Sequence, residues 1–434
     1  MKNKLINMKK LIVTPFLFCL PLFSTWTQAQ ESVDVLIHEN GTERQESIEL
    51  PQSMTYPLDS LFSDWQAKSY INPNKDCYTS TENPFFSDSV YIDRLSRIPA
   101  IMEMPYNDIV RKFIDRYTER QRSQVSFMLG ACNFYMPIFE EALDAYGLPL
   151  ELKYLPIIES ALKPSARSRV GASGLWQFML NTGKMYGLES NSLVDERYDP
   201  IKATWAAARY LKDLYDRYQD WNLVIAAYNC GPGTVNKAIR RADGKTDYWE
   251  IYNYLPKETR GYVPAFIAAT YVMTYYCKHN ICPMETSLPT ATDTVQVSRN
   301  LHFKQLADIC GISLEEIKSL NPQFKKDIIP GDTKPQTLRL PVSSIGAFID
   351  NQDTIYVHRF DELFKNRKTV AVTETKTTKR ATAGSGNLTY HRIRSGETLG
   401  GIAQRYGVTV KQLQNWNGMR NTKISAGKQL KIYK

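Results

Sequence analysis

Apolar residues in the middle of the chain recur at the spacing of amphipathic helices. Between Val90 and Cys277 they return every three or four positions, as with Ile109, Phe113 and Tyr117 on one face. Such stripes predict helices that bury one side. Helices are expected over 150–162, 175–186, 201–218, 222–228, 234–241 and 258–277, an all-α region of ordinary domain size.

Helix-start and helix-stop residues support this division. Gly147 and Pro149 separate two helices, because glycine is common just past a helix end and proline just inside a start. Asp199 precedes Pro200, which predicts an N-cap followed by the first helical residue.

The spacing of apolar residues along the chain changes after Pro289. Residues 292–342 have the pattern of a strand, two short helices and a strand, and residues 389–434 repeat it. Matching residues lie 96 positions apart, and the closing strands 92 positions apart, which indicates a duplicated βααβ unit. The pairs at the first offset are Val297/Ile393, Ala307/Ala403, Gly311/Gly407, Ile312/Val408, Ile317/Leu413, Asn321/Asn417 and Gly331/Gly427.

Two segments lack a clear period. Residues 30–88 are polar, and we expect a variable segment that wraps the surface or is partly disordered, without identifiable chemistry. Residues 343–388 are expected to link the βααβ units, and 369–387 has the Thr-, Lys-, Ala- and Gly-rich composition of a flexible tether. The predicted fold class is mainly α, with an all-α domain at 89–286 followed by two small α+β units.

Residues 1–29 have the order of a secretory signal peptide. Four lysines precede the apolar run Leu11–Phe23, and Thr27 and Ala29 are small residues suited to cleavage. An uncleaved anchor is the alternative, although the run is short for a bilayer span. Cys19 would be the modified residue of a lipoprotein signal, but the bulky residues immediately before it favour a secreted protein without a lipid anchor.

Charge and cysteine content narrow the class of protein further. The formal net charge of +9 falls to +5 when the four signal lysines are removed, and no arginine-rich stripe with interleaved aromatics is present, so nucleic-acid binding is not expected. Six cysteines remain, an even number that permits disulfides. Cys277 and Cys282 could pair with each other or with Cys77, free thiols are the equal alternative, and the full set is Cys77, Cys132, Cys230, Cys277, Cys282 and Cys310.

The sequence contains no metal or cofactor motif. The histidines are scattered without helix-face pairing, and there is no glycine-rich phosphate loop. We therefore expect no metal and no cofactor.

One acidic residue in the helical region has an unusual setting. Glu159 follows the apolar run Leu155–Ile158, and burial raises a carboxyl pKa because it disfavours the charged form. A carboxyl group that stays protonated near neutral pH can act as a general acid. A solvated surface glutamate is the alternative. Downstream, Gly171–Gly174 has little side-chain bulk, so a large ligand could approach the backbone there.

Four motifs in this order together resemble those of family 1 lytic transglycosylases. They are Glu159-Ser160-Ala161, Gly171–Met179, Ala227–Gly233 and Glu258–Val263. The resemblance implies a goose-lysozyme-like fold and non-hydrolytic cleavage of peptidoglycan. Glu159 would protonate the oxygen between N-acetylmuramic acid and N-acetylglucosamine, and would then accept the proton of the muramoyl C6 hydroxyl as a 1,6-anhydro ring closes.

Ordinary glycosidases use two carboxylates, whereas the family that this chain resembles uses one. Asp195, Glu196 and Asp199 are the other acidic residues to weigh. Asp199 is expected to be a helix cap, and the other two are expected to be solvated loop charges.

The same resemblance assigns residues to a sugar groove. Amides and phenols hydrogen-bond sugar hydroxyl and acetamido groups, and aromatic faces cover apolar sugar faces. Ser173 would orient Glu159 or only satisfy its turn, Met179 would pack on a sugar or in the core, and Glu258 would line the groove or form an ion pair. The expected substrate-binding set is Ser173, Gln177, Met179, Tyr228, Asn229 and Tyr262.

The βααβ units resemble LysM modules, which bind chains containing N-acetylglucosamine. The copy at 389–434 carries the pattern in full, including Tyr390–Leu399 and Asn415–Asn417. The copy at 292–342 is degenerate, because Arg299–Phe303 departs from the pattern, and its sugar binding is in doubt.

These features predict a monomeric enzyme exported to the periplasm or cell envelope, with membrane attachment left open. Its expected partners are peptidoglycan glycan strands in the groove and N-acetylglucosamine chains at the LysM modules. Two alternatives stay open: a hydrolytic lysozyme of goose type, and a catalytically silent peptidoglycan-binding protein.

Overall fold

The computed structural model describes residues 31–39, 42–57, 80, 82–286, 289, 291–365, 388–394, 397–419, 421–422, 424–425 and 427–433. The expected signal peptide, the tether at 369–387 and Cys77 lie outside these residues. Within them, buried side chains gather into three hydrophobic cores, one for the helical domain and one for each βααβ unit. The predicted fold class, mainly α with two small α+β units, is confirmed.

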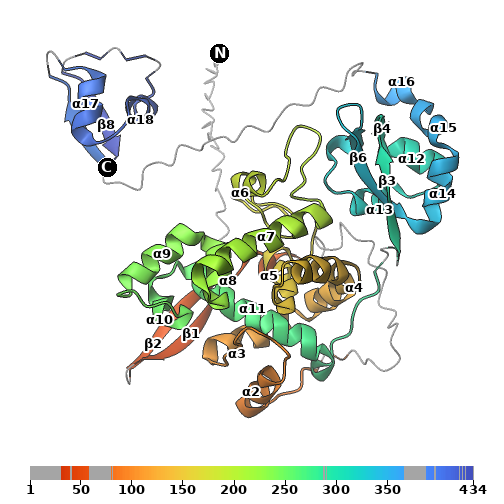
Figure 1. The fold of residues 1–434 in the computed structure, drawn as a ribbon. Helices are drawn as coiled ribbons and strands as arrows, with labels where there is room; N and C mark the ends of the chain where they lie inside the picture. The colour runs from red at the N-terminus through yellow and green to blue at the C-terminus, as the bar shows by residue number, and fades with distance from the viewer. Residues whose placement is uncertain are drawn as a thin grey trace, which may run out of the picture.

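The helical domain is built around α11 (Lys257–Tyr275), which is buried along almost its whole length. A helix that is apolar on all sides needs neighbours on all sides. Figure 1 shows α11 crossing this domain, and it packs against α3, α4, α5, α8 and strand β2. The other helices are α2 (Asp88–Ser96), α3 (Asp108–Asp115), α4 (Arg122–Ala145), α5 (Leu155–Ser160), α6 (Leu180–Met185), α7 (Pro200–Tyr218), α8 (Trp221–Cys230), α9 (Pro232–Arg241) and α10 (Tyr248–Ile251).

The described parts of the N-terminal segment, residues 31–39 and 42–57, belong to this domain. Strands β1 (Ser32–Glu39) and β2 (Thr42–Glu49) form an antiparallel hairpin. Val35 and Ile48 are each 1% exposed and lie in the main core, and the 3-10 helix η1 (Gln52–Thr55) packs against α5. The expectation that residues 30–88 only wrap the surface is wrong for this part.

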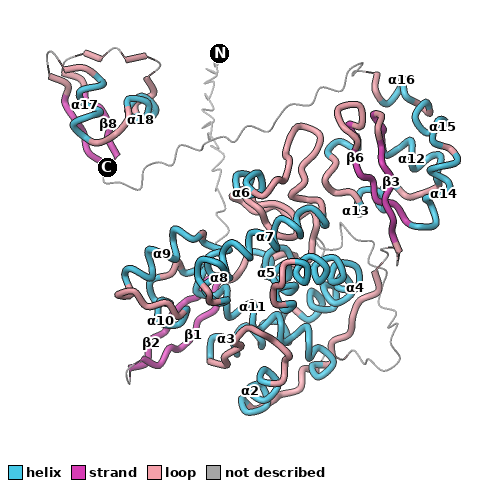
Figure 2. Tube along the Cα trace, in the orientation of Figure 1, coloured by secondary structure: helices cyan, strands magenta, loops and turns pink. Residues whose placement is uncertain are grey.

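Two predicted helices are shorter than expected. The segment 150–162 splits into the 3-10 helix η3 (Leu150–Tyr154) and α5, because Pro156 lacks the N–H that a continuous helix would use. Left-handed backbone at Ala161 and Leu162 ends α5. The segment 175–186 is helical only in α6, and Figure 2 shows mostly loop between α5 and α7.

The first βααβ unit comprises β3 (Thr292–Val297), β4 (Asn300–His302), α12 (Phe303–Cys310), α13 (Leu314–Leu320), β5 (Ile328–Pro330) and β6 (Gln336–Pro341). Strands β3 and β6 are antiparallel, as are β4 and β5. The expected linker departs from the prediction at its start, because α14 (Val342–Asp350), α15 (Gln352–Val357) and α16 (Phe360–Leu363) follow at once. Phe348 and Ile355 are buried in the core of this unit, so these helices belong to it.

The second unit repeats the outer strand pair and the two helices of the first, as β7 (Leu388–Arg392), α17 (Leu399–Tyr406), α18 (Val410–Trp416) and β8 (Gln429–Tyr433). One paired asparagine has the same role in both. Asn321 accepts from the amide of Arg339 at 2.8 Å, and Asn417 accepts from the amide of Lys431 at 2.7 Å. Each therefore ties the second helix of its unit to the closing strand.

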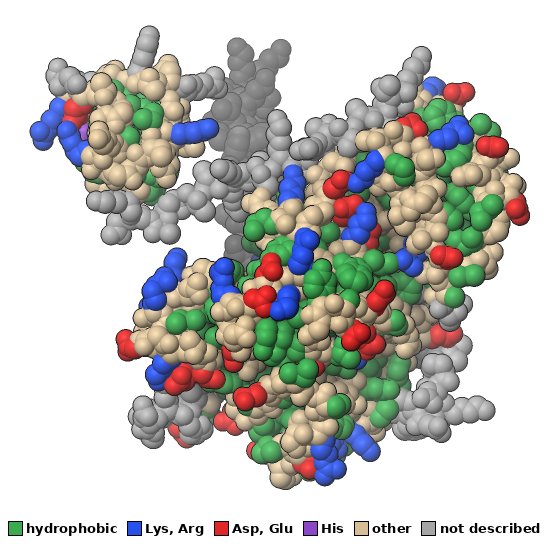
Figure 3. Space-filling model, viewed as in Figure 1, with side chains coloured by type: hydrophobic (Ala, Val, Ile, Leu, Met, Phe, Trp, Pro, Cys, Tyr) green, Lys and Arg blue, Asp and Glu red, His purple; other side chains and the backbone are tan. Residues whose placement is uncertain are grey.

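Among the described residues, none of the helices has the length and apolarity needed to cross a bilayer. On the face shown in Figure 3, acidic and basic side chains are interspersed, in keeping with a mild net charge. Cys282 is in a disulfide and Cys277 is free, so these two do not pair with each other. Cys132, Cys230 and Cys310 are also free.

Candidate active site

Glu159 lies in the last turn of α5, at the point where the helix ends. Ile157 and Ile158 before it are each 1% exposed, whereas Glu159 itself is partly exposed. The neighbouring Ser160 fixes this end of the helix, because its hydroxyl donates to the carbonyl of Leu175 at 2.9 Å. The end of α5 is therefore tied to the turn that follows, while the Glu159 side chain stays partly exposed.

Three effects set the protonation of Glu159. Burial is the largest, and it raises the pKa of the Glu159 carboxyl group to about 8. The hydroxyl of Tyr262 donates to Oε1 of Glu159, which favours the charged form and lowers the pKa. The charge of Glu258 raises it. With a pKa of about 8, the group is mostly protonated at neutral pH, as a general acid requires.

Aromatic hydroxyl groups surround this carboxyl group. Tyr262, on α11, is 2% exposed, and Tyr228, on α8, donates its hydroxyl to the carbonyl of Trp176 at 2.7 Å. Burial raises the pKa of both phenols well above the ordinary value, and the nearby charge of Glu159 adds to the effect. Both therefore stay neutral and donate hydrogen bonds at any working pH.

Asn229 and Glu258 occupy the neighbouring part of the site. Asn229 Oδ1 accepts from the hydroxyl of Thr259 at 2.7 Å, and its side chain also hydrogen-bonds Glu258. Burial of the carboxyl group raises the pKa of Glu258, and the bond to Asn229 lowers it in part. The charge of Glu258 also raises the pKa of Glu159, so the two carboxyl groups lie near each other.

The turn from Gly171 to Phe178 contacts α5 and α8, because the carbonyls of Leu175 and Trp176 accept from the hydroxyls of Ser160 and Tyr228. The Gln177 side chain donates to the carbonyl of Gly174 at 2.7 Å and to that of Ala166 at 3.2 Å. Ser173 is fully buried, and its hydroxyl points to the carbonyl of Gly171 at 3.4 Å, so it satisfies the turn. Met179, at the end of the turn, is 45% exposed and is not part of the core.

The remaining acidic residues have structural partners. Asp199 caps α7 by accepting from the amides of Ile201 and Lys202, each at 3.0 Å, as expected. Asp195 and Glu196 are 2% and 4% exposed, so the expectation that they are solvated is wrong. Asp195 pairs with Arg197 and Glu196 pairs with Lys202, and these cations satisfy their charges.

Sequence reasoning missed Tyr56, which follows η1. Burial raises the pKa of Tyr56 to about 12, and the charge of Glu159 contributes, which places this phenol near the Glu159 carboxyl group. The hydroxyl of Ser53 in η1 also donates to the carbonyl of Ile158. The alternation of Val33 and Val35 was the available signal for the hairpin that brings this segment here.

In the part of the chain that the structure describes, no group of three or more His, Cys, Asp or Glu side chains could hold a metal ion. The arrangement instead places the protonated Glu159 carboxyl group beside Glu258, the neutral phenols of Tyr228 and Tyr262, and the amide of Asn229. Such a site can donate a proton and take it back.

Comparison with known proteins agrees with this class of site. Residues 136–251 match the family model described as the transglycosylase SLT domain. Residues 291–357 match the LysM-like domain of lytic transglycosylase MltD, and residues 391–432 match the LysM domain. These matches define a lytic transglycosylase with two LysM-type units.

Over 335 residues, the chain is 32% identical to membrane-bound lytic murein transglycosylase D of Escherichia coli K12, covering 76% of this chain and 70% of that protein. The chain therefore belongs to the family of membrane-bound lytic murein transglycosylase D. It is also 34% identical over 116 residues to the soluble lytic murein transglycosylase of the same strain, which covers 25% of this chain and 18% of that protein.

Proposed function

We propose that Glu159 is the single acid/base of a peptidoglycan lytic transglycosylase. The observation that supports this most is the partly exposed carboxyl group at the end of α5, which accepts from the Tyr262 hydroxyl and whose pKa burial raises to about 8. A group poised near the working pH can both give and accept a proton.

In the proposed reaction, Glu159 first protonates the oxygen that joins N-acetylmuramic acid to N-acetylglucosamine, and the glycosidic C–O bond breaks. The ionised carboxylate then accepts the proton of the muramoyl C6 hydroxyl, whose oxygen bonds to the anomeric carbon. The product carries a 1,6-anhydro ring, no water is consumed, and Glu159 returns to its protonated form. A second carboxylate is not needed, because the substrate supplies the nucleophile.

The groove residues have supporting roles in this proposal. Tyr262 stabilises the ionised form of Glu159 through its hydrogen bond. Gln177 and Asn229 recognise acetamido and hydroxyl groups, Tyr228 supplies an aromatic face, and exposed Met179 packs on a sugar ring. Ser173 contributes by shaping the turn.

We propose that residues 89–286, completed by the hairpin of 32–49, cleave the strand, and that the LysM module at 389–434 holds the enzyme on N-acetylglucosamine-containing chains. The chain is expected to act as a monomer in the periplasm or cell envelope after cleavage behind Ala29. Sequencing the N-terminus of the mature protein from the producing cells tests the last step.

Mass spectrometry of fragments released from purified peptidoglycan tests the reaction. Fragments lighter by one water than hydrolytic ones, without a reducing end, are expected from the wild-type protein, and none from Glu159→Gln, which should still bind. Reducing ends would instead support a hydrolase, with Glu258 as the carboxylate that activates water. Binding without any fragments would support the silent binding protein.

A further inference from the structure

A loop of the helical domain is built into the first LysM-like unit. Between α6 and α7 the chain reaches this unit, where Leu193 and Val194, 1% and 2% exposed, join its hydrophobic core (Figure 1). Val194 also pairs with Phe324 as in an antiparallel ladder. The two domains therefore share buried side chains and backbone hydrogen bonds, rather than a surface contact alone.

Lys325 adds a charged link at the same place. Its Nζ donates to the carbonyl of Asn191 at 2.8 Å and lies 3.4 Å from Oδ2 of Asp195, whose side chain is 3% exposed. Its backbone amide donates to the carbonyl of Leu193 at 2.6 Å. One residue of the LysM-like unit thus contacts this loop at Asn191, Leu193 and Asp195.

Asp195 connects Lys325 to Arg197 through its carboxylate. Its carboxylate accepts from Nε of Arg197 at 3.0 Å and from Nη2 at 2.9 Å, a two-pronged pair with both side chains buried. Burial alone would raise the pKa of Asp195, but the bonds and charge of Arg197, with the charge of Lys325, hold it below the ordinary value. Asp195 is therefore ionised at any working pH and anchors two cations.

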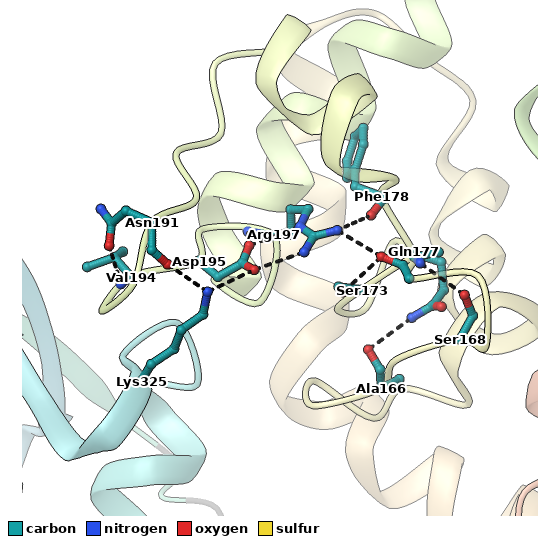
Figure 4. Close-up of polar contacts among 12 residues, drawn as sticks. Ala166, Ser168, Ser173, Gln177, Phe178, Asn191, Val194, Asp195, Arg197 and Lys325 are labelled. Carbon is teal, nitrogen blue, oxygen red and sulfur yellow. Dashed lines mark hydrogen bonds and ion pairs between the residues drawn. The ribbon is translucent and has the colours of Figure 1, made fainter. Parts of the chain in front are cut away.

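Arg197 in turn hydrogen-bonds the turn from Gly171 to Phe178. Its Nη1 donates to the carbonyl of Gly171 at 2.9 Å and to that of Phe178 at 3.1 Å, the two ends of the turn (Figure 4). Figure 4 shows Lys325, Asp195, Arg197 and the turn bearing Gln177 in one continuous chain of polar contacts. Both carbonyls belong to the turn that carries Gln177.

The LysM-like unit has internal contacts that suit a fixed structural part. The side chain of Asn300, within the departing segment Arg299–Phe303, donates to Asp332 at 2.5 Å. Gln305 on α12 donates to the carbonyls of Tyr356 and His358, which fastens α15 over this helix. These polar groups already have partners within the unit.

We propose that Lys325 is a positioning residue for the transglycosylase reaction, acting through Asp195 and Arg197 on the turn that carries Gln177. The first LysM-like unit is then a fixed part of the groove wall and not a separate binding module. This inference rests on the proposed function, in which Gln177 contacts the glycan.

Three variants of the full-length chain test it. Lys325→Met removes the charge and keeps the aliphatic stem, and Lys325→Arg keeps the charge. Lys334→Met is the matched control, because Lys334 pairs with Glu189 across the same interface at 2.7 Å, with both side chains about half exposed and no link to Asp195. Rates on soluble glycan fragments are measured well below the melting temperature, so that wall binding and unfolding do not contribute.

Lys325→Met is expected to raise KM about tenfold with a smaller effect on kcat, because a displaced groove wall misplaces the glycan. Lys325→Arg should recover most of the loss, and Lys334→Met should match the wild type. Equal KM values for Lys325→Met and Lys334→Met would overturn the inference, whatever their melting temperatures. Failure of the proposed function would differ, because the wild-type protein would then give no anhydro product.

Discussion

Two substitutions beside Glu159 are expected to shift its pKa in opposite directions. In Tyr262→Phe the carboxylate loses the hydrogen bond that favours its charged form, so its pKa should rise. In Glu258→Gln a neighbouring negative charge disappears, so its pKa should fall. The pKa of one carboxyl group should therefore rise with one substitution on α11 and fall with the other.

The size of the first shift follows from hydrogen-bond energies. A hydrogen bond to a charged group contributes about 1.5–3 kcal/mol, and one pKa unit corresponds to about 1.4 kcal/mol. Glu159 is partly exposed, so water will replace part of the lost bond, and we expect a rise of about one unit. The charge of Glu258 is the smaller contribution, so its removal should lower the pKa by less.

The assay is the pH dependence of kcat/KM on soluble glycan, whose basic limb reports the pKa of the acid in the free enzyme. The wild-type limb is expected near pH 8. Tyr248→Phe is the control, because this buried phenol donates to the carbonyls of Thr259 and Arg260 and not to Glu159. Shifts of the same sign for both variants, or no shift in either, would refute the reasoning.

Three other outcomes are expected. The pKa of Glu159 is about 8 in the folded protein against an ordinary 4.5, so the folded state holds more protons between these pH values and its stability falls as pH rises through them. Glu159→Gln should therefore be more stable than the wild type at pH 8 by about 1–3 kcal/mol, after allowance for solvent screening, and equal to it at pH 4, as thermal melts at both pH values will show. Gly174→Ala would place Cβ 1.9 Å from the carbonyl oxygen of Arg197 and should lower the free energy of unfolding by about 3 kcal/mol or more. Gly171→Ala meets no atom within 4 Å and should lower it by only about 1–2 kcal/mol of backbone strain. Equal melting temperatures of the two variants would contradict this expectation. Deleting residues 389–434 should weaken co-sedimentation with insoluble peptidoglycan and spare cleavage of soluble fragments, and unaltered sedimentation would count against a wall-binding role.

What could be predicted from the sequence was mostly local. The cap at Asp199 and the apolar surroundings of Glu159 depend on residues within a few positions, and both are present in the structure. The duplicated βααβ unit was also readable, because equivalent residues such as Asn321 and Asn417 keep their spacing.

What could not be predicted depends on partners distant in sequence. Asp195 is an ordinary loop acid by sequence, but in the structure it is buried beside Arg197 and Lys325, the second of which comes from the first LysM-like unit. The hairpin of 32–49 has a polar outer face, so its few inward residues gave a weak pattern, and the approach of Tyr56 to Glu159 was not foreseeable. Pro156 is a local signal for a helix break, but the helical spacing of the apolar residues across 150–162 is the stronger pattern, so the sequence predicts a single helix.

The separation between the parts of the active site has a consequence for folding. Tyr262 meets Glu159 across 103 positions, and Arg260 meets Glu46 in the hairpin across 214. Contacts of such high contact order form late, because the entropy of closing long loops opposes them until many have formed together. During synthesis the ribosome releases the hairpin and Glu159 well before α11. The surroundings of Glu159 described above are therefore complete only once α11, which ends at Tyr275 of the 434 residues, has been synthesised.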